Sequence, residues 1–340
     1  MADFEIRELR PGDETSLLET FNLVFGADDP GFQVRTRAQW SWAFEQNPAG
    51  QRVFVALAPA AGPDRSQQVV AQYAALPTRI WSDGAEHRFA QIVDSFVHPD
   101  HRGGGRLFVR TARAFFEAYG GPQRDLVHFG WPVERALKIG RRALGYEVVR
   151  TQLFLVRGLA PGATSAPSGV ECIDSPEQLG EHFGQQLQWL FERCVGEFGA
   201  STLRDAAWFR WRFHDRPGNT YRTLGVRDAE GILRGLCVLG RGAGQLTGAG
   251  LLVDWLVPPA ELEVADLLLA GVTAELASQA ATEAVVLFPE WSPWFAHFQE
   301  RGFLAHPSAY CAVARAFHPR FDSTWLRDQW WYQLSDTDLC

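Results

Sequence analysis

The sequence predicts an α+β fold, a mixed α/β sheet flanked by helices, built as two tandem domains. The chain has 340 residues, which is long for one compact core. In its first half, runs with strand character come first and a strand–helix–strand–helix–strand unit follows. Three stretches of the first half also recur in the second half, in the same order.

The recurring stretches indicate an internal repeat. The pattern Trp-x-Phe-x-x-x-Pro begins at Trp42 and again at Trp211, 169 residues later. Residues 92–99, IVDSFVHP, resemble residues 252–259, LVDWLVPP, at an offset of 160. A third pair, ALGYEVVRTQLFLV and ERGFLAHPSAYCAV, has an offset of 157. Because the order is kept and the offsets drift by only about a dozen residues, we infer a tandem repeat of one domain.

The composition of the chain predicts where the two domains meet. Residues 159–168 are rich in Gly, Pro, Ala and Ser and have no hydrophobic period, as is typical of a linker. We therefore expect a first domain at 1–158, this linker, and a second domain at 169–318. A tryptophan-rich tail, 319–340, follows the second domain.

The elements of the first domain follow from hydrophobic periodicity. Leu17, Phe21 and Val24 fall on one face of a first helix, and a later stretch from Leu107 to Tyr119 repeats apolar residues at i, i+1, i+4 and i+5. Runs rich in Val, Phe, Tyr and Ile indicate strands. The expected elements are a helix at 13–25, strands at 52–58, 68–76 and 87–99, a helix at 107–119, a strand at 125–132, a helix at 133–144 and a strand at 146–156.

Three consecutive glycines, Gly103, Gly104 and Gly105, connect a predicted strand to a predicted helix. A turn of this kind exposes backbone N–H groups at a helix start and can bind an anion, and glycine allows close approach and positive φ. Basic residues surround the turn, which suits a phosphorylated ligand: His98, His101, Arg102, Arg106, Arg110 and Arg113. A flexible turn with solvated arginines explains the glycines alone equally well. The dinucleotide and nucleoside-triphosphate motifs are absent.

The stretch VDSFVHPDHRGGGRL resembles the acyl-CoA motif of the GNAT acetyltransferase superfamily. In that family a strand ending in Val-x-Pro precedes Arg/Gln-x-x-Gly-x-Gly/Ala, which here corresponds to Val97, Pro99, Arg102, Gly105 and Leu107. Leu107 is larger than the residue usual at its position. The stretch FGWPVERALKIGRRALGY resembles the next segment of the family.

The resemblance implies domains with a mostly antiparallel central sheet and a cofactor, acetyl-CoA or another acyl-CoA. By it, the amides of Arg102, Gly103, Gly104, Gly105 and Arg106 bind the pyrophosphate. The backbone of Phe96 and Val97 pairs with the pantetheine arm, and an N–H group near Val97 polarises the thioester carbonyl. The implied activity is N-acyl transfer, most simply of acetyl to a primary amine of a small acceptor such as an amino sugar.

The second half keeps the strand and its prolines but lacks the glycines. It carries Glu261, Glu263 and Asp266 where the phosphates would lie, so we expect it not to bind CoA and to resemble the degenerate half of tandem GNAT proteins. Because the strand occurs there without RGGGR, packing does not require the glycines. This comparison favours a ligand as their explanation.

Three residues are candidates for proton transfer. Asp94 lies two residues before Phe96 on the motif strand. His128 lies on the next predicted strand, 125–132, and Glu134 begins the helix that follows this strand. Each has a structural alternative; for Asp94 it is that the second half keeps Asp254 at the same place. The tyrosine that family members often use as the acid is replaced by Arg141.

In the family, the segment after the acyl-CoA motif commonly reads Gly-Phe-Pro-Asn, and Val133 replaces that asparagine here.

The acidic end of the tail offers a further candidate site. Asp336 and Asp338 either enter the cleft and bind the amine or are simply part of an exposed C-terminus.

Composition limits the other function classes. The net charge of −8 argues against a nucleic-acid or anionic-membrane partner, and it disfavours a transferase that uses aminoacyl-tRNA. The five cysteines are scattered, so we expect no metal site, no disulfide framework and a reducing cytoplasm. We also expect no signal peptide and no membrane helix. A non-catalytic acyl-CoA-binding or scaffold protein remains the alternative to an enzyme.

Overall fold

The computed structural model of the chain describes residues 4–27, 31–59, 67–160, 167–173, 180–196, 198–218, 220–243 and 246–339. The chain forms two compact units. The first unit comprises Met1–Arg79, His87–Arg150 and Tyr310–Thr324, and the second comprises Ile80–Glu86, Thr151–Ala309 and Trp325–Cys340. Each unit is described separately below.

The units differ in extent from the predicted domains. The first unit ends its main stretch at Arg150 and takes in 310–324, which the prediction divides between the second domain and the tail. The physical reason is strand pairing: β13 (Leu304–Ala316) pairs antiparallel with β5 (Val127–Gly130), from Val313 opposite Gly130 to Ala316 opposite Val127. Most of the predicted linker, residues 161–166, lies outside the described residues.

The sheet of the first unit has the strand order β1-β2-β3-β4-β5-β13-β6. All its described pairings are antiparallel except that of β4 with β5, which flank the helix α3. The elements that complete this unit are β1 (Glu5–Glu8), α1 (Glu14–Gly26), α2 (Arg37–Phe44), β2 (Arg52–Leu57), β3 (Val69–Ser82), β4 (Ala85–Val97), α3 (Arg106–Tyr119), α4 (Glu134–Ile139) and β6 (Glu147–Gly158). The predicted elements of the first half are thus present, and α2 is an additional helix.

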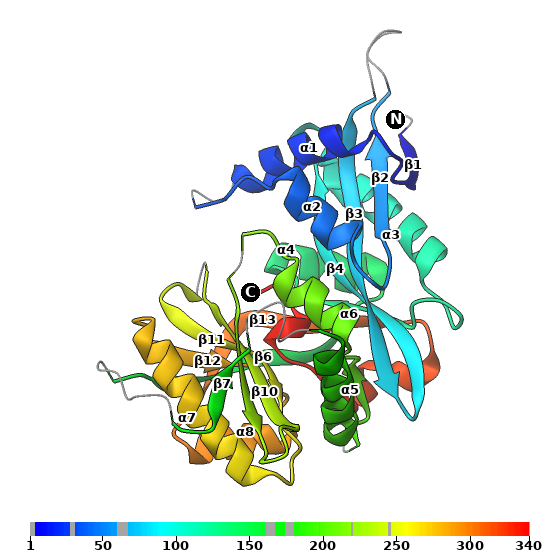
Figure 1. Cartoon of the computed structure of the whole chain (residues 1–340). Coiled ribbons are helices and arrows are strands. Elements are labelled where there is room, and N and C mark those ends of the chain that lie inside the picture. Colours follow the sequence, from blue (N-terminus) through cyan, green and yellow to red (C-terminus); the bar gives the residue numbers. More distant parts are fainter. Residues whose placement is uncertain are drawn as a thin grey trace. The chain divides into compact units, whose positions relative to one another are not determined.

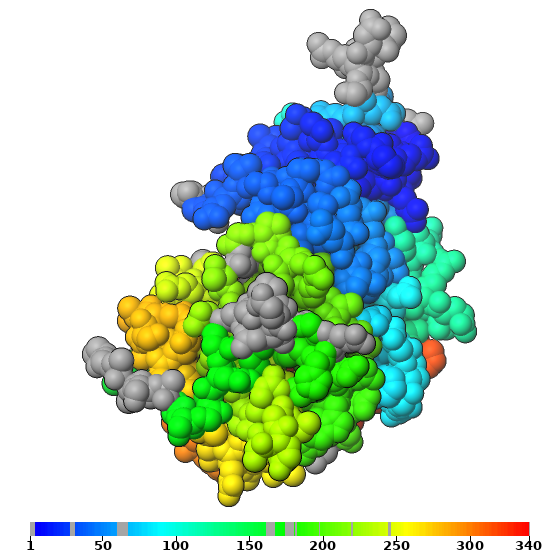
Figure 2. Space-filling view, in the orientation of Figure 1, coloured from blue at the N-terminus to red at the C-terminus, as the bar shows by residue number. Residues whose placement is uncertain are grey.

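Helices cover both faces of this sheet (Figure 1). Residues of α1 and α2 form one core cluster with β2, β3 and β4, whereas residues of α3 form another with Phe54, Tyr73 and Ala90. Figure 2 shows α1 and α2, in blue, as a continuous stretch of the surface of this unit. The helix α2 begins with a capping box, in which Thr36 and Gln39 satisfy each other's backbone N–H groups.

The strand β4 contains a kink at Asp94, whose φ is +52°. Ala90 packs with the α3 cluster, Val93 and Phe96 pack with the α1 and α2 cluster, and Val97 packs with Leu107 of α3. In a regular strand, residues 90 and 96 would face the same side. One extra residue between Val93 and Phe96 therefore reverses the alternation of side chains between the two faces of the sheet, as in a β-bulge.

The second unit repeats this plan, with the strand order β13-β6-β12-β11-β10-β9-β7. A parallel pair, β11 with β12, again flanks a helix, α7, and β14 also pairs parallel with β8. Residues of α7 and α8 share a core cluster with β9 to β12. The elements are β7 (Val170–Cys172), α5 (Glu181–Val195), β8 (Ala200–Thr202), α6 (Ala206–Phe209), β9 (Arg222–Arg227), β10 (Leu233–Arg241), β11 (Ala249–Leu256), α7 (Leu262–Ser278), β12 (Glu283–Val286), α8 (Pro293–Glu300), α9 (Ser323–Gln329) and β14 (Trp330–Trp331).

The strand β11 has a β-bulge at the corresponding place. Its register with β10 shifts, so that Asp254 lies opposite Val238 and Leu252 opposite Leu239. Leu252 and Trp255 consequently face the same core cluster. Each unit thus has a mostly antiparallel sheet flanked by helices, which confirms the predicted fold class.

Two further searches of the described residues gave a negative result. None of their helices combines the length and the apolar character that crossing a membrane requires. No three described His, Cys, Asp or Glu side chains come together as metal ligands would.

Candidate active site

The glycine turn, Gly103–Gly105, lies between a 3₁₀ turn after β4, Pro99–His101, and the start of α3. The N–H of His98 donates to the carbonyl of Val70 (2.7 Å), which ends the pairing of β4 with β3. Gly104 and Gly105 have φ of +63° and +76°, a conformation that favours glycine. A Cβ atom on Gly104 would meet nothing within 4 Å. The backbone conformation, and not crowding, therefore requires a glycine at 104.

Part of the predicted amide set is used inside the turn. The N–H of Gly105 donates to the carbonyl of Arg102 (3.2 Å), and the N–H of Arg102 donates to that of Pro99 (3.3 Å). Gly105 is the N-cap of α3, so the first-turn N–H groups of that helix, starting at Arg106, point towards the turn. The positive end of a 14-residue helix thus lies beside an exposed glycine loop, which favours an anion there.

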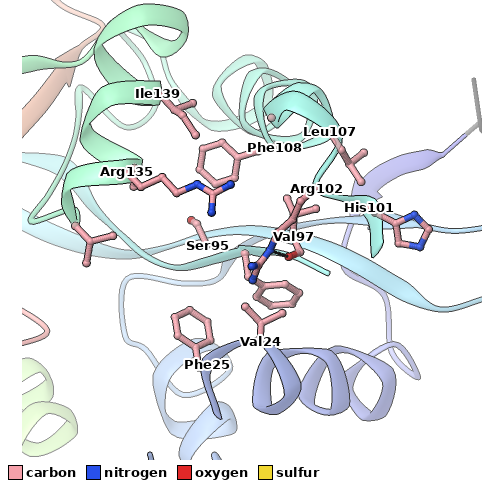
Figure 3. Close-up of a pocket in the computed structure, with 14 residues that line it drawn as sticks. Val24, Phe25, Ser95, Val97, His101, Arg102, Leu107, Phe108, Arg135 and Ile139 are labelled. Atoms are coloured by element: carbon pink, nitrogen blue, oxygen red, sulfur yellow. Dashed lines mark hydrogen bonds between the residues drawn. The ribbon is translucent and has the colours of Figure 1, made fainter. Parts of the chain in front are cut away.

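A pocket of about 330 Å³ lies between β4 and three helices of the first unit. Figure 3 shows Val24 and Phe25 of α1 on one side of the strand and Phe108 and Ile139 on the other. The lining is mainly apolar and comprises Val24, Phe25, Phe96, Val97, Leu107, Phe108, Val133, Ala136 and Ile139, with His101, Arg102, Gly105, Ser95 and Arg135 as its remaining members. Its shape and composition suit an apolar chain that ends in an anionic group at the turn.

Two arginines supply positive charge to this pocket. Arg135 reaches from α4 towards the middle of the pocket, and Arg102 reaches into it from the turn (Figure 3). The Nε atom of Arg102 donates to the carbonyl of Val97 (3.1 Å), at the end of β4. No carboxylate binds the Arg135 side chain among the described residues. Of the predicted basic cluster, His101 and Arg102 line the pocket, and Arg135 is an addition to it.

The strand β4 also offers an unpaired edge at the pocket. Its parallel register with β5 ends at Gln91 opposite Phe129, although β4 continues to Val97. β5 ends at Gly130, and Ser95, Phe96 and Val97, beyond this pairing, line the pocket. An extended ligand can add to such an edge as a strand does.

Asp94 lies at the kink of β4, beside the pocket. Its carboxylate accepts two hydrogen bonds from Arg35, at 2.5 and 3.2 Å, and the pair is only partly buried. Its backbone carbonyl accepts from the Gln72 side chain (2.7 Å).

His128 is enclosed on the α3 side of β5. It is 1% exposed, and its ring packs against Phe115, Phe116 and Phe317. Burial lowers the pKa of His128 against the opposing effect of Asp125, 3.4 Å away, so the ring is neutral at pH 7. It is not among the residues that line the pocket.

Glu134 has an exposed carboxylate at the first position of α4. Lys138 donates to it (2.6 Å), and this hydrogen bond lowers the pKa of Glu134. The neighbouring Val133 and Arg135 line the pocket, whereas Glu134 does not.

The acidic tail residues have different surroundings. Asp336 is buried in the second unit, where it accepts a hydrogen bond from Arg204 (2.8 Å) and one from the backbone N–H of Gln333 (2.8 Å). Asp338 is exposed. Neither residue is among those that line the pocket of the first unit, and their part in a substrate site stays a prediction.

The predicted site therefore divides into two groups. Phe96, Val97, Arg102 and Gly105 line one pocket. The other predicted residues of the first unit do not line it: Asp94, Gly103, Gly104, Arg106, His128 and Glu134. Sequence reasoning did not identify Arg135 or Arg35 as site residues. Arg135 lies four residues before Ile139 on the predicted helix 133–144, so the two share one helix face. This spacing is a signal that could have indicated Arg135.

The family comparison agrees with this geometry. Residues 5–148 match the model of the acetyltransferase (GNAT) domain. No curated protein sequence matches the chain.

Solved structures resemble the whole chain in fold. A probable N-acyltransferase of unknown function from Enterococcus faecalis V583 has a TM-score of 0.64 at 15% identity, over 93% of this chain and 73% of its own. Saccharomyces cerevisiae N-myristoyltransferase with bound myristoyl-CoA has a TM-score of 0.60 at 13% identity, over 92% and 82%. A GCN5-related N-acetyltransferase from Anabaena variabilis ATCC 29413 has a TM-score of 0.57 at 15% identity, over 93% and 73%. Residues 5–148 thus match an acetyltransferase (GNAT) domain, and the solved structures resemble the chain in fold.

Proposed function

We propose that the chain is an acyl-CoA-dependent N-acyltransferase that works in the pocket of the first unit. The simplest form is transfer of acetyl from acetyl-CoA to a primary amine of a small acceptor, such as an amino sugar. The observation that carries the proposal is the apolar pocket that leads from the unpaired edge of β4 to the glycine turn. We place the reaction in the cytoplasm, where the free cysteines among the described residues would stay reduced.

The pocket residues fit the parts of an acyl-CoA. The first-turn N–H groups of α3 and the exposed glycines at 103 and 104 would bind the pyrophosphate. Arg135 and Arg102 would add charge-assisted contacts to phosphate oxygens, for which Arg102 has to leave the Val97 carbonyl. The backbone of Phe96 and Val97 would then pair with the amides of the pantetheine arm.

The chemistry asks little of the side chains once the two substrates are held. The amine nitrogen attacks the thioester carbonyl, a C–N bond forms, the C–S bond breaks, and the amine loses a proton to a base or water. The kink at Asp94 turns the backbone of β4, and we propose that an N–H group following it polarises the carbonyl. Asp94 and Glu134 each lie next to residues that line the pocket, and we retain Asp94 because it lies on β4, where Ser95, Phe96 and Val97 line the pocket.

A second candidate function is a non-catalytic acyl-CoA-binding or scaffold protein. It is favoured by a specific observation: none of Asp94, His128 and Glu134 lines the pocket, and Arg141 stands where the usual tyrosine acid would be.

Thiol release from acetyl-CoA separates the two candidates. Free CoA is measured with a thiol reagent in the presence of a panel of primary amines, with acetyl-CoA binding measured on the same protein. The enzyme proposal expects at least one amine to accelerate thiol release over the rate without amine. Binding of acetyl-CoA with no acceleration by any amine would favour the scaffold instead.

A further inference from the structure

In the second unit, a buried Arg–Asp pair holds the C-terminal tail. Arg204 binds Asp254 at 2.9 to 3.3 Å, and the two side chains are 0% and 1% exposed. The carboxylate of Asp254 also accepts from the Ser335 hydroxyl (2.7 Å) and the Gln333 amide (2.9 Å). Arg204 also donates to the carboxylate of Asp336 (2.8 Å). The pair thus binds a hydrogen-bond donor on its aspartate and a carboxylate on its arginine.

The first unit contains the same pair at the repeat offsets. Arg35 precedes Arg204 by 169 residues, and Asp94 precedes Asp254 by 160, as the recurring stretches do. Each arginine directly precedes a helix N-cap, Thr36 or Asp205, whose side chain accepts a backbone hydrogen bond. Each aspartate lies at an irregularity of its strand: Asp94 has a positive φ, and Asp254 lies at the register shift of β11. The two pairs are therefore structural counterparts.

The two pairs differ in what occupies them. The side chains of Arg35 and Asp94 are 28% and 16% exposed. Among the described residues, the Arg35 guanidinium hydrogen-bonds only to the Asp94 carboxylate, and this carboxylate accepts only from that guanidinium. A guanidinium has five N–H groups and a carboxylate accepts several hydrogen bonds, so both have donor and acceptor capacity left.

The Arg35–Asp94 pair lies next to the pocket. The guanidinium of Arg35 stacks on Phe21 at 4.5 Å, and the Phe21 ring is 4.4 Å from that of Phe25 and 6.1 Å from that of Phe96. Phe25 and Phe96 line the pocket, as does Ser95, the residue after Asp94. A ligand on the pair would therefore approach the pocket from the α1 side.

We propose that Arg35 and Asp94 bind the acceptor, and that the acceptor is an amine that also carries a carboxylate. Arg35 donates to the carboxylate, as Arg204 does to Asp336, and Asp94 accepts from an ammonium, hydroxyl or amide donor, as Asp254 does from Ser335 and Gln333. The proposal rests on the proposed acyltransferase function and narrows its acceptor. An amino sugar would satisfy it only if it also carries an acid group.

Matched acceptors test this proposal. Thiol release from acetyl-CoA is measured with L-alanine, L-serine and L-threonine and with their C-terminal amides, which lack a carboxylate. We expect kcat/KM to be about 10–100-fold higher for the acids, since a charge-assisted hydrogen bond contributes that much. In Arg35→Met the preference should vanish through a rise in the acceptor KM, with the KM for acetyl-CoA unchanged, and Arg35→Lys should restore part of it.

The control is an exposed pair on α2. Arg37 and Glu45 form a two-contact ion pair at 3.0 and 2.7 Å, and Arg37→Met should leave the acceptor preference unchanged. Thermal melting of all variants checks that they are folded. An equal preference in wild type for acids and amides, or an unchanged preference in Arg35→Met, would overturn the acceptor site.

Binding measured without turnover keeps the acceptor site distinct from the proposed function. The same six amines are titrated by calorimetry into the protein saturated with CoA. If the acids bind, and Arg35→Met and Asp94→Asn both weaken them, the acceptor site stands even when no amine releases thiol, and the enzyme proposal alone fails. If none of the six binds, the acceptor site is wrong.

Discussion

The ring of Phe317 occupies the space beside Gly120 so closely that a Cβ atom there would lie 2.4 Å from the ring. Gly120 ends α3, and Phe317 follows β13 almost 200 residues later. Phe317 also packs against His128 and Phe116 in the α3 core cluster. The end of β13 is thus part of the core of the acetyltransferase domain.

Gly120→Ala should destabilise the protein through this contact alone. The φ of Gly120 is −79°, so alanine fits the backbone and only the overlap with Phe317 opposes it. Overpacking of this kind typically costs about 1–3 kcal/mol of unfolding free energy. Urea denaturation measures it, with Gly103→Ala as control, where a Cβ atom meets nothing within 4 Å. Equal stability of the two variants would contradict the contact.

The fragment 1–158 should not fold cooperatively on its own. It lacks the strand that pairs with β5 from Gly130 to Val127, and it lacks Phe317. An exposed strand edge and an open core would remain. Amide exchange and thermal melting of the fragment test this, with the same fragment joined by a flexible linker to residues 308–324 as control. A sharp melting transition of 1–158 alone would contradict the assigned units.

Arg204→Met should be among the most damaging substitutions in the second unit. It would leave Asp254 and Asp336 buried without their cation, and breaking such a buried pair costs about 3–5 kcal/mol. Arg37→Met, which breaks an exposed pair, should cost less than about 1 kcal/mol. Denaturant unfolding of both variants gives the comparison, and a loss for Arg204→Met no larger than that for Arg37→Met would refute the network.

His128 should make stability fall as the pH drops below neutral. Burial lowers its pKa in the folded chain, whereas the unfolded chain keeps the ordinary value of about 6.5. Below that pH the unfolded state binds a proton that the folded state does not, so unfolding becomes easier. The unfolding free energy of His128→Gln should therefore change less between pH 7.5 and pH 5 than that of wild type. Parallel pH profiles would show that His128 does not titrate differently on folding.

The sequence allowed the glycine turn to be predicted because its signals are local. The consecutive glycines, the start of an amphipathic helix and the neighbouring basic residues all lie within a few positions of Gly104. The Arg35–Asp94 pair joins residues 59 positions apart, and no local pattern reveals such a contact. The repeat offsets did hold that information, since they align Arg35 with Arg204, but only the structure shows that both arginines bind their strand aspartates.

Other parts of the site depended on packing that a single sequence leaves open. His128 lies on a four-residue strand that is buried throughout, so alternation could not tell whether its ring faces the pocket or the core. The same holds for β13, whose pattern suits a strand of either unit. β13 pairs with the edge of β5 that β4 leaves open. Which strand edges are open follows from the order of all strands in the sheet, and a local sequence pattern does not contain that order.

Calorimetric titration of acetyl-CoA into the intact chain tests the central claim, that the glycine turn of the first unit binds an acyl-CoA. We expect one site per chain, because Glu261 stands at the start of α7 in the second unit and is held there by Arg234 (2.7 Å). Gly104→Ala and Gly104→Glu strain the backbone alike, by about 1–2 kcal/mol, but only glutamate adds a negative charge. Binding should persist in the alanine variant and be lost in the glutamate variant. No binding to wild type, or equal binding to both variants, would contradict the account.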